Sequence, residues 1–259
     1  MKRIYKSPKE PELLCKYRNL YPDETWEHFR RHWRKGYRQV KEATIMDQQG
    51  LCAYCEVSIK LAEEESEVDD FRIEHFFPKS VVNKGAHNYH LDWWNLLGVC
   101  HGGSQPCVPD AQWRFSTKKR DRSCDVPKGS KEITGRILNP LKIPASIRLF
   151  RYAEHTGKII IDETVCPLGL QKKARTTIKE LNLNAPRLMR MRKVVIEWLN
   201  EEITAVMQTG TTLEEGLSLL AESFLLPDDD GRYVPFFTMI RWYLGAAAEQ
   251  LLAEHNYNI

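Results

Sequence analysis

The sequence of 259 residues contains no run of about 18 apolar residues, so it offers no candidate for a membrane-spanning helix. It also lacks an apolar stretch after Lys2 and Arg3, which argues against a secretory signal peptide. We find no internal repeat and no low-complexity tract. With 42% hydrophobic residues, the chain is expected to be a globular protein of the cytoplasm, built as one large domain or two small ones.

Net charge is small as well, because 38 Lys and Arg residues against 35 Asp and Glu residues leave only +3. This total conceals blocks of one sign. Residues 114–151 carry 11 basic and 3 acidic side chains, whereas residues 194–259 carry 2 basic and 11 acidic ones. Such blocks suit a polyanion as the partner of the basic stretches and a protein as the partner of the acidic end, although solvated helix faces would give the same pattern.

Residues 1–50 form the first of three segments that differ in pattern. Their Pro- and Lys-rich beginning, residues 1–22, predicts an extended arm. From Glu24 onward apolar residues recur every three or four positions, which predicts one amphipathic helix that Gly50 ends. The apolar positions of that helix are Trp26, Phe29, Trp33, Tyr37, Val40 and Thr44.

Residues 51–142 have little helical periodicity and many Gly, Pro, Cys and His residues. Residues 143–259 open with a predicted β-hairpin around residues 154–157 and continue as helices. Thr212 and Glu215 form a capping box that starts one of these helices, and Pro235 is expected to start the last one. The whole pattern predicts an α+β protein in which the middle segment is embedded in mainly helical surroundings.

Seven cysteines in a reducing compartment favour metal binding or catalysis over disulfides. Cys52 and Cys55 form a C-x-x-C turn with the spacing that a tetrahedral Zn²⁺ accepts. Two further sulfurs would come from downstream, where Cys100 is followed by Cys107 and Cys124. A thioredoxin-like redox pair would need a βαβ context that this stretch lacks, while two unrelated core cysteines would show the same spacing.

A second group of polar residues lies between these cysteines. Glu74 and His75 belong to a predicted strand over residues 71–77. In chain order the full series is Cys52, Cys55, Glu74, His75, Pro78, Asn95, Leu96, Cys100, Cys124, Asp125, Lys128 and Gly129. This series resembles the HNH endonucleases of the His-Me finger (ββα-metal) fold. It is more closely similar to the retron- and Septu-associated, PtuB-like nucleases of bacterial antiphage defence.

The resemblance implies a zinc-stabilised ββα-metal core within residues 51–142. The implied zinc ligands are Cys52, Cys55, Cys100 and Cys124, with Cys107 as the alternative to the last. His75 would act as the general base, and Asn95 would tie down the adjacent loop. Glu74 and Asp125 would hold a catalytic Mg²⁺ or Mn²⁺ through oxygen.

Basic residues that follow the C-x-x-C turn are expected to contact the phosphates of a nucleic acid. They are Arg114, Lys118, Lys119, Arg120, Arg122 and Lys128. Trp113 and Phe115 lie among them and either stack on bases or pack in the core. His87, His90 and His101 are close in sequence, either as substrate contacts or as ordinary loop residues.

The expected function is therefore metal-dependent hydrolysis of phosphodiester bonds in nucleic acid, with DNA favoured. The resemblance further implies an effector of antiphage defence that assembles with a PtuA-like ATPase, and with a retron reverse transcriptase and its RNA–DNA product. The alternative is a catalytically silent, zinc-stabilised module that binds nucleic acid or serves as an adaptor. The complete set of Glu74, His75, Asn95 and Asp125 favours the enzyme, because a scaffold has no need of a base.

Overall fold

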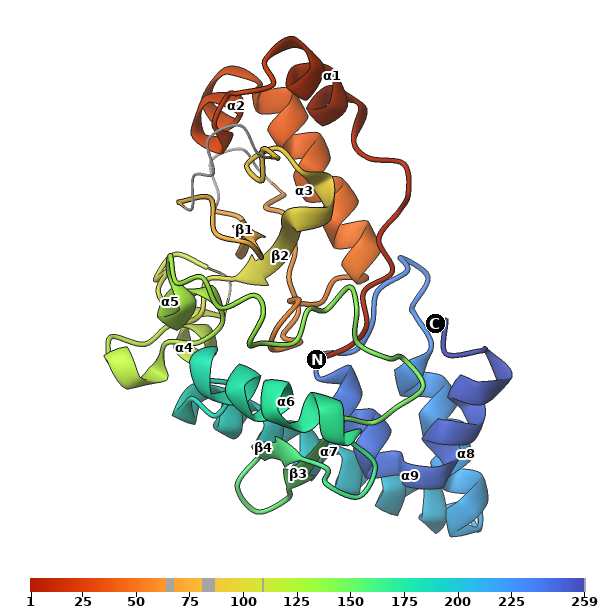
Figure 1. Ribbon diagram of the computed structural model, residues 1–259. Helices are drawn as coiled ribbons and strands as arrows, with labels where there is room; N and C mark the ends of the chain where they lie inside the picture. Colours follow the sequence, from red (N-terminus) through yellow and green to blue (C-terminus); the bar gives the residue numbers. More distant parts are fainter. Residues whose placement is uncertain (64–67, 81–86, 109, 259) are drawn as a thin grey trace.

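The computed structural model describes residues 1–63, 68–80, 87–108 and 110–258 (Figure 1). Its helices and strands follow in the order α1 (Glu12–Leu20), α2 (Trp26–His32), α3 (Arg34–Gln48), β1 (Phe71–His75), η1 (Trp93–Asn95), β2 (Leu96–Cys100), α4 (Ala111–Arg114), η2 (Lys119–Asp121), α5 (Asp125–Lys128), β3 (Phe150–Ala153), β4 (Lys158–Ile161), α6 (Leu168–Glu180), α7 (Pro186–Gln208), α8 (Leu213–Leu225) and α9 (Phe237–Glu254). The expected α+β class is confirmed.

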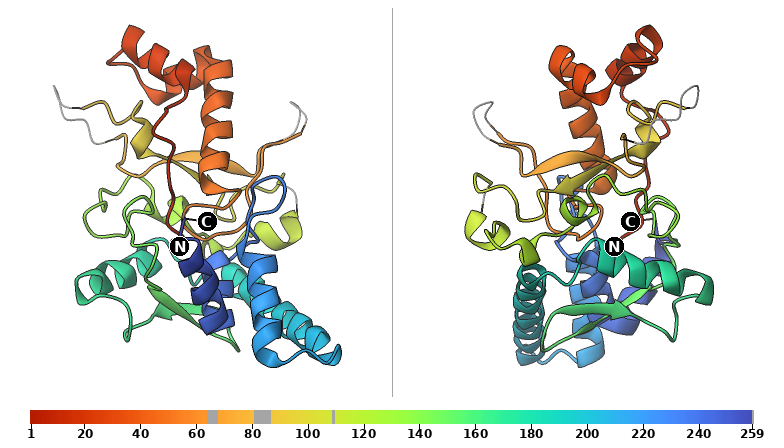
Figure 2. Two further views of the ribbon diagram at one scale, coloured as in Figure 1. Left: turned by 90° about the vertical axis from the view of Figure 1, so that its right-hand side faces the viewer. Right: turned by 60° about the vertical axis from the view of Figure 1, so that its left-hand side comes forward.

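The elements form three tiers, visible in both views of Figure 2. Helices α1 to α3 occupy one end, the antiparallel pair β1–β2 lies in the middle, and the hairpin β3–β4 with α6 to α9 occupies the other end. A single cluster of buried side chains runs from Leu14 through the middle tier to Leu188. Among the described residues, no helix combines the length and the apolar character that crossing a membrane requires.

The prediction for residues 1–50 was wrong in two respects. Helix α1 lies inside the stretch expected to be an extended arm, and two helices replace the single one expected from Glu24. The break falls at Trp33, whose φ of −120° and ψ of 59° are not helical. It lets Phe29 of α2 fold onto α3 at Gly36, where a Cβ would lie only 3.0 Å from the Phe29 ring. Tyr17 of α1 is fully buried against Phe29, at 5.0 Å between ring centroids.

The C-terminal third follows its sequence pattern more closely. The hairpin β3–β4 turns through residues 154–157, and the capping box of Thr212 and Glu215 is formed at the start of α8. Pro235, however, does not start the last helix. Phe236 has a φ of 62°, and its N–H donates to the carbonyl of Glu56, so α9 begins at Phe237. This contact holds α9 against the turn that carries Cys52 and Cys55.

Helix α3 is attached to the β1–β2 pair at Gly98, which lies opposite Ile73 in the register. The buried side chain of Gln48 donates to the Gly98 carbonyl at 2.8 Å and accepts from the Gly98 N–H at 2.7 Å. A Cβ at Gly98 would lie 2.9 Å from the Thr44 methyl group, so only glycine allows this close approach without displacing α3. The Gln48 amide thus anchors β2 of the middle tier to helix α3.

We predict that Gln48→Ala lowers the free energy of unfolding by about 2–3 kcal/mol, because the buried N–H of Gly98 would lose its partner. The measurement is chemical denaturation followed by circular dichroism. Met46→Ala serves as the control on the same helix, since Met46 is 76% exposed and its truncation should change stability little. Equal effects of the two substitutions would contradict the anchoring role of Gln48.

Candidate active site and zinc centre

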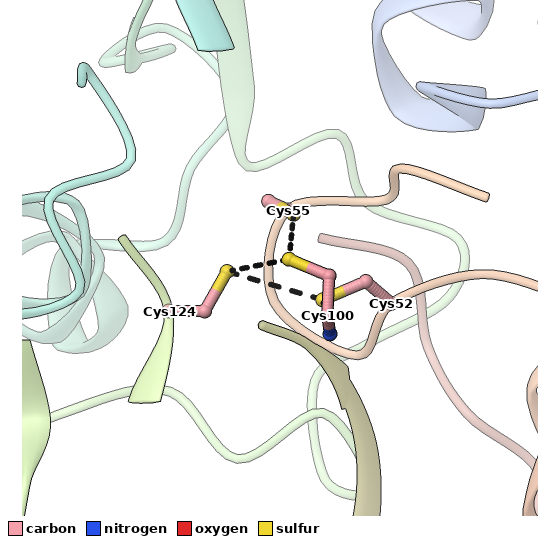
Figure 3. A group of neighbouring side chains, drawn as sticks. All are labelled: Cys52, Cys55, Cys100 and Cys124. Carbon is pink, nitrogen blue, oxygen red and sulfur yellow. Dashed lines mark hydrogen bonds between the residues drawn. The ribbon is translucent and has the colours of Figure 1, made fainter. Parts of the chain in front are cut away.

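Four cysteine side chains converge in the buried interior of the middle tier (Figure 3). The Sγ–Sγ distances are 3.9 Å for Cys52–Cys124, 3.6 Å for Cys55–Cys100 and 3.7 Å for Cys100–Cys124. All four sulfurs lie within 4.8 Å of one another. A tetrahedral Zn²⁺ with Zn–S bonds of about 2.3 Å spaces its sulfurs about 3.8 Å apart, whereas a disulfide needs about 2.05 Å. The donor set therefore fits zinc.

The fourth sulfur belongs to Cys124, while Cys107 is exposed and outside the group. Cys124 has a φ of 61°, an uncommon conformation for a residue with a side chain. Its N–H donates to the carbonyl of Leu181, and the Asn182 side chain donates to the carbonyls of Arg120 and Arg122. These bonds from the turn after α6 fix the return of the chain toward the cysteines.

Gly102 closes the insertion between Cys100 and Cys124. Its φ is +57°, its carbonyl accepts from the Ser123 N–H, and a Cβ there would lie 2.2 Å from the Ser123 carbonyl oxygen. Only glycine allows this approach, which brings the third and fourth sulfurs together. The insertion therefore leaves the four-cysteine group intact although the two ligands are far apart in sequence.

A second group of charged side chains lies beside the cysteines on one face of β1. Arg72 and Glu74 share this face because strand residues alternate. The Arg72 Nε is 2.6 Å from Asp125 Oδ2, and the Lys128 Nζ is 2.5 Å from Glu74 Oε1. Lys128 also donates to the His75 carbonyl at 3.0 Å. The structure thus brings Glu74 and Asp125 into one cluster with two cations.

Burial and neighbouring charges shift the pKa of both carboxyl groups in this cluster. Burial raises the pKa of Glu74 to about 6, with the Lys128 charge opposing and the Asp125 charge adding to the shift. Burial likewise raises the pKa of Asp125, while Arg72 opposes that shift. The Asp125 Oδ1 and the Tyr54 hydroxyl are buried and have no hydrogen-bond partner among the described residues. Two neighbouring carboxylates with an unpartnered oxygen are a donor set that suits Mg²⁺ or Mn²⁺.

His75 lies on the opposite face of β1 and is 4% exposed. Its ring meets that of Trp26 edge-on at 5.2 Å between centroids, and its Nε2 is 3.1 Å from the His90 carbonyl oxygen. Burial lowers the pKa of His75 to about 3, so the imidazole is neutral at physiological pH. The imidazole is therefore neutral, but its burial under α2 also makes it a weak proton acceptor.

Asn95 ties together the segment that follows β1. Its Oδ1 accepts from the Phe77 N–H at 2.7 Å, and its Nδ2 donates to the carbonyls of Phe77 and Tyr89 at 3.0 and 2.9 Å. The side chain is buried and all its hydrogen-bonding groups face backbone rather than solvent. Asn95 thus has the bonds of a residue that holds a loop in place.

The six basic residues expected to contact nucleic acid fall into two groups. Lys118, Lys119 and Arg120 are exposed. Arg114 instead pairs with buried Asp70 at 2.6 Å, and Arg122 lies over the Phe115 ring. Lys128 is 1% exposed and belongs to the Glu74 pair described above. Half of the set is therefore engaged within the protein.

Two residues of this region were not expected from the sequence, Arg72 and Trp26. Arg72 precedes Glu74 by two positions in a predicted strand, so strand alternation alone could have assigned it to the same face. Trp26 was expected only as a core residue of an amphipathic helix. Its contact with His75 joins positions far apart in the chain, and no local pattern marks such a contact.

A comparison with curated proteins finds a relative that is 34% identical over 220 residues. The alignment covers 77% of this chain and 81% of the relative, an Escherichia coli protein described as "Retron Ec83 putative HNH endonuclease". No protein-family model matches the chain.

We predict that Cys124→Ser lowers the zinc content of the purified protein from about one ion per chain, because it removes one of four sulfurs. Elemental analysis of the protein provides the measurement. Cys107→Ser is the matched control, and zinc should remain bound because Cys107 is exposed outside the group. The reverse result, with zinc lost only in Cys107→Ser, would show that the fourth ligand is wrongly assigned.

We also predict that acid destabilises the protein partly through His75. The unfolded chain protonates this residue near pH 6.5, whereas burial keeps the folded-state pKa at about 3. The folded-state pKa is lowered, so stability is lost as the pH falls below about 6.5. At about pH 5 the loss is about 2 kcal/mol. In His75→Phe the free energy of unfolding should fall by about 2 kcal/mol less between about pH 7 and pH 5 than in the wild type. His155→Phe, at the exposed hairpin turn, should show the same pH dependence as the wild type.

Proposed function

This chain belongs to the family of retron-associated HNH endonucleases, and we propose that it hydrolyses phosphodiester bonds of nucleic acid, preferentially DNA, with a bound divalent metal ion. The observation that carries the proposal is the cluster that Glu74 and Asp125 form through Lys128 and Arg72, in which the Asp125 Oδ1 has no hydrogen-bond partner among the described residues. An unpartnered carboxylate oxygen beside a second carboxylate offers ligands for a divalent cation.

His75 is proposed as the general base. A neutral imidazole can take a proton from the attacking water, but the buried His75, whose pKa is lowered to about 3, is a weak base until water reaches the ring. Bound Mg²⁺ or Mn²⁺, held by Glu74 and Asp125, would stabilise the charge that develops on the leaving oxygen. Because Trp26 covers the His75 ring, α2 has to shift before water and substrate can reach the imidazole.

Lys128 and Asn95 have supporting roles in this proposal. The Lys128 ammonium joins the Glu74 carboxylate to the His75 carbonyl, so it holds both residues at the end of β1. Asn95 holds the following segment through the backbone of Phe77. Neither side chain needs to exchange a proton. Their hydrogen bonds limit the movement of the base and of the metal-binding carboxylate.

Zinc is proposed to act only through structure. Its four ligands come from the turn after α3, from the end of β2 and from the residue before α5. β2 pairs with β1, the strand that carries Glu74, and Cys124 directly precedes Asp125, which pairs with Arg72. An ion that clamps these segments supplies rigidity that the two-stranded sheet alone cannot provide.

The retron in the name of the Escherichia coli relative supports a role as the effector of a bacterial antiphage defence system of the retron or Septu type. In that role the protein would act in the cytoplasm with a PtuA-like ATPase, and with a retron reverse transcriptase and its RNA–DNA product. A covered His75 suits such an effector, because an unregulated nuclease would damage the host.

A second candidate function is a catalytically silent, zinc-stabilised module that binds nucleic acid or joins other proteins. The burial of His75 favours it, since the ring is only 4% exposed and contacts Trp26. The two candidates differ in whether the protein cleaves nucleic acid at all and, if it does, whether cleavage depends on His75 and Asp125.

We predict that the wild-type protein, alone or with its defence partners, cleaves plasmid or single-stranded DNA in the presence of Mg²⁺. His75→Ala should reduce the cleavage rate by ~10²–10⁴-fold through loss of the base, and Asp125→Ala should reduce it while weakening metal binding. His155→Ala is the matched control and should cleave like the wild type, because His155 lies exposed in the β3–β4 turn. Unchanged cleavage by His75→Ala would remove it as the base, and no cleavage by any combination would favour the silent module.

A further inference from the structure

We infer that a groove beside Asn95 binds unpaired nucleotides of a single-stranded nucleic acid. The inference rests on the proposed function, because it specifies the substrate class of the same site. The groove has a volume of about 740 Å³, within the usual range of ligand-binding sites. The lining residues that matter most are Phe77, Tyr89, Trp94, Asn95, Lys142 and Lys173.

One wall of the groove is aromatic. The Phe77 and Tyr89 rings stack at 4.2 Å between centroids and 30° between planes. Trp94 in η1 is 52% exposed, whereas its neighbour Trp93 is 1% exposed. A half-exposed tryptophan in a groove leaves a large ring face in water, and each base that stacks on such a face contributes about 1–3 kcal/mol.

The remaining lining supplies positive charge. Lys142 and Lys173 are exposed, and neither makes an ion pair with the described parts of the chain. Asp92 is the one carboxylate among the described lining residues, and it is engaged by the His87 ring and the Trp94 N–H. Ring faces together with unpaired ammonium groups match the bases and phosphates of a nucleic acid strand.

This chemistry selects an unpaired strand over a duplex. In a duplex the base faces are stacked on one another and cannot reach Trp94, Phe77 or Tyr89. An apolar peptide would cover the rings but would leave both lysines without a counter-charge. The groove is therefore best matched by two or three successive unpaired nucleotides.

The position of the groove connects it to the site. Asn95 lines it and is hydrogen-bonded to Phe77, and Phe76, which directly follows His75, lines it as well. A strand held there would lie against the segment that leaves β1 at the Glu74-His75 pair. The basic stretch 114–122 is a poorer candidate, because Arg114 and Arg122 are engaged within the protein.

The test is direct binding of a fluorescein-labelled oligothymidylate of about ten nucleotides, measured by anisotropy without added Mg²⁺ so that no cleavage is required. We expect Trp94→Ala to weaken binding by about 5–100-fold and Trp94→Phe to retain most of it. The double substitution Lys142→Ala with Lys173→Ala should make the slope of log affinity against log salt concentration shallower, by the equivalent of about one to two phosphate contacts. An unlabelled duplex of the same length should compete poorly.

Trp113→Ala is the matched control, because Trp113 is 53% exposed and lies in α4, outside the groove. Wild-type affinity in Trp94→Ala, loss of affinity only in Trp113→Ala, equal competition by the duplex, or no binding by the wild type would each overturn the inference. Thermal unfolding of every variant checks that the fold is retained. Because binding is measured without cleavage, a protein that binds through Trp94 yet cleaves nothing would refute the proposed function and leave the groove assignment standing.

Discussion

Four buried thiols, whose sulfurs all lie within 4.8 Å of one another, are the constraint on which the middle of the molecule depends. The thiols come from three segments: the turn after α3, the end of β2 and the residue before α5. None of these segments belongs to a helix or sheet that is long enough to be stable alone. A Zn²⁺ bound to four thiolates carries a net charge of −2, which is costly to bury without neighbouring cations. Arg187 and Arg192 of α7 are buried nearby, where they interact electrostatically with the thiols. Helix α7 therefore supplies two buried cationic side chains beside the four-cysteine group.

Strand β1 divides the candidate active site into two halves. Its alternation directs Arg72 and Glu74 toward α5, and it directs His75 toward α2. The carboxylate half is stabilised by ion pairs, whereas the histidine half is held by burial and by one backbone contact. Lys128 joins the two halves, because it contacts both Glu74 and the His75 backbone. Helix α2 contacts His75 through Trp26, whereas Glu74 and Asp125 pair with Lys128 and Arg72.

Much of the local structure could be predicted from short-range patterns. The capping box at Thr212, the hairpin turn at residues 154–157 and the strand before Pro78 each depend on residues within a few positions of one another. Predictions failed where a distant contact overrode the local pattern. Tyr17 stabilises α1 by packing against α2, and Phe236 leaves the helical conformation because its N–H bonds to Glu56. The helix breaks at Trp33, which belongs to the apolar stripe, and Phe29 packs on Gly36.

For the site, the sequence by itself determined the kinds of groups present: two thiols in a C-x-x-C turn with further cysteines downstream, a carboxylate beside a histidine, and an asparagine followed by leucine. Spacing and residue type are local properties, so they can be read from the chain. Only the tertiary structure decided that Cys124 joins the group in place of Cys107, that Arg114 and Arg122 are engaged within the protein, and that Trp26 covers His75. Each of these outcomes depends on which distant segments pack against one another in the protein interior. Such long-range packing produces no periodic pattern of residues in the sequence.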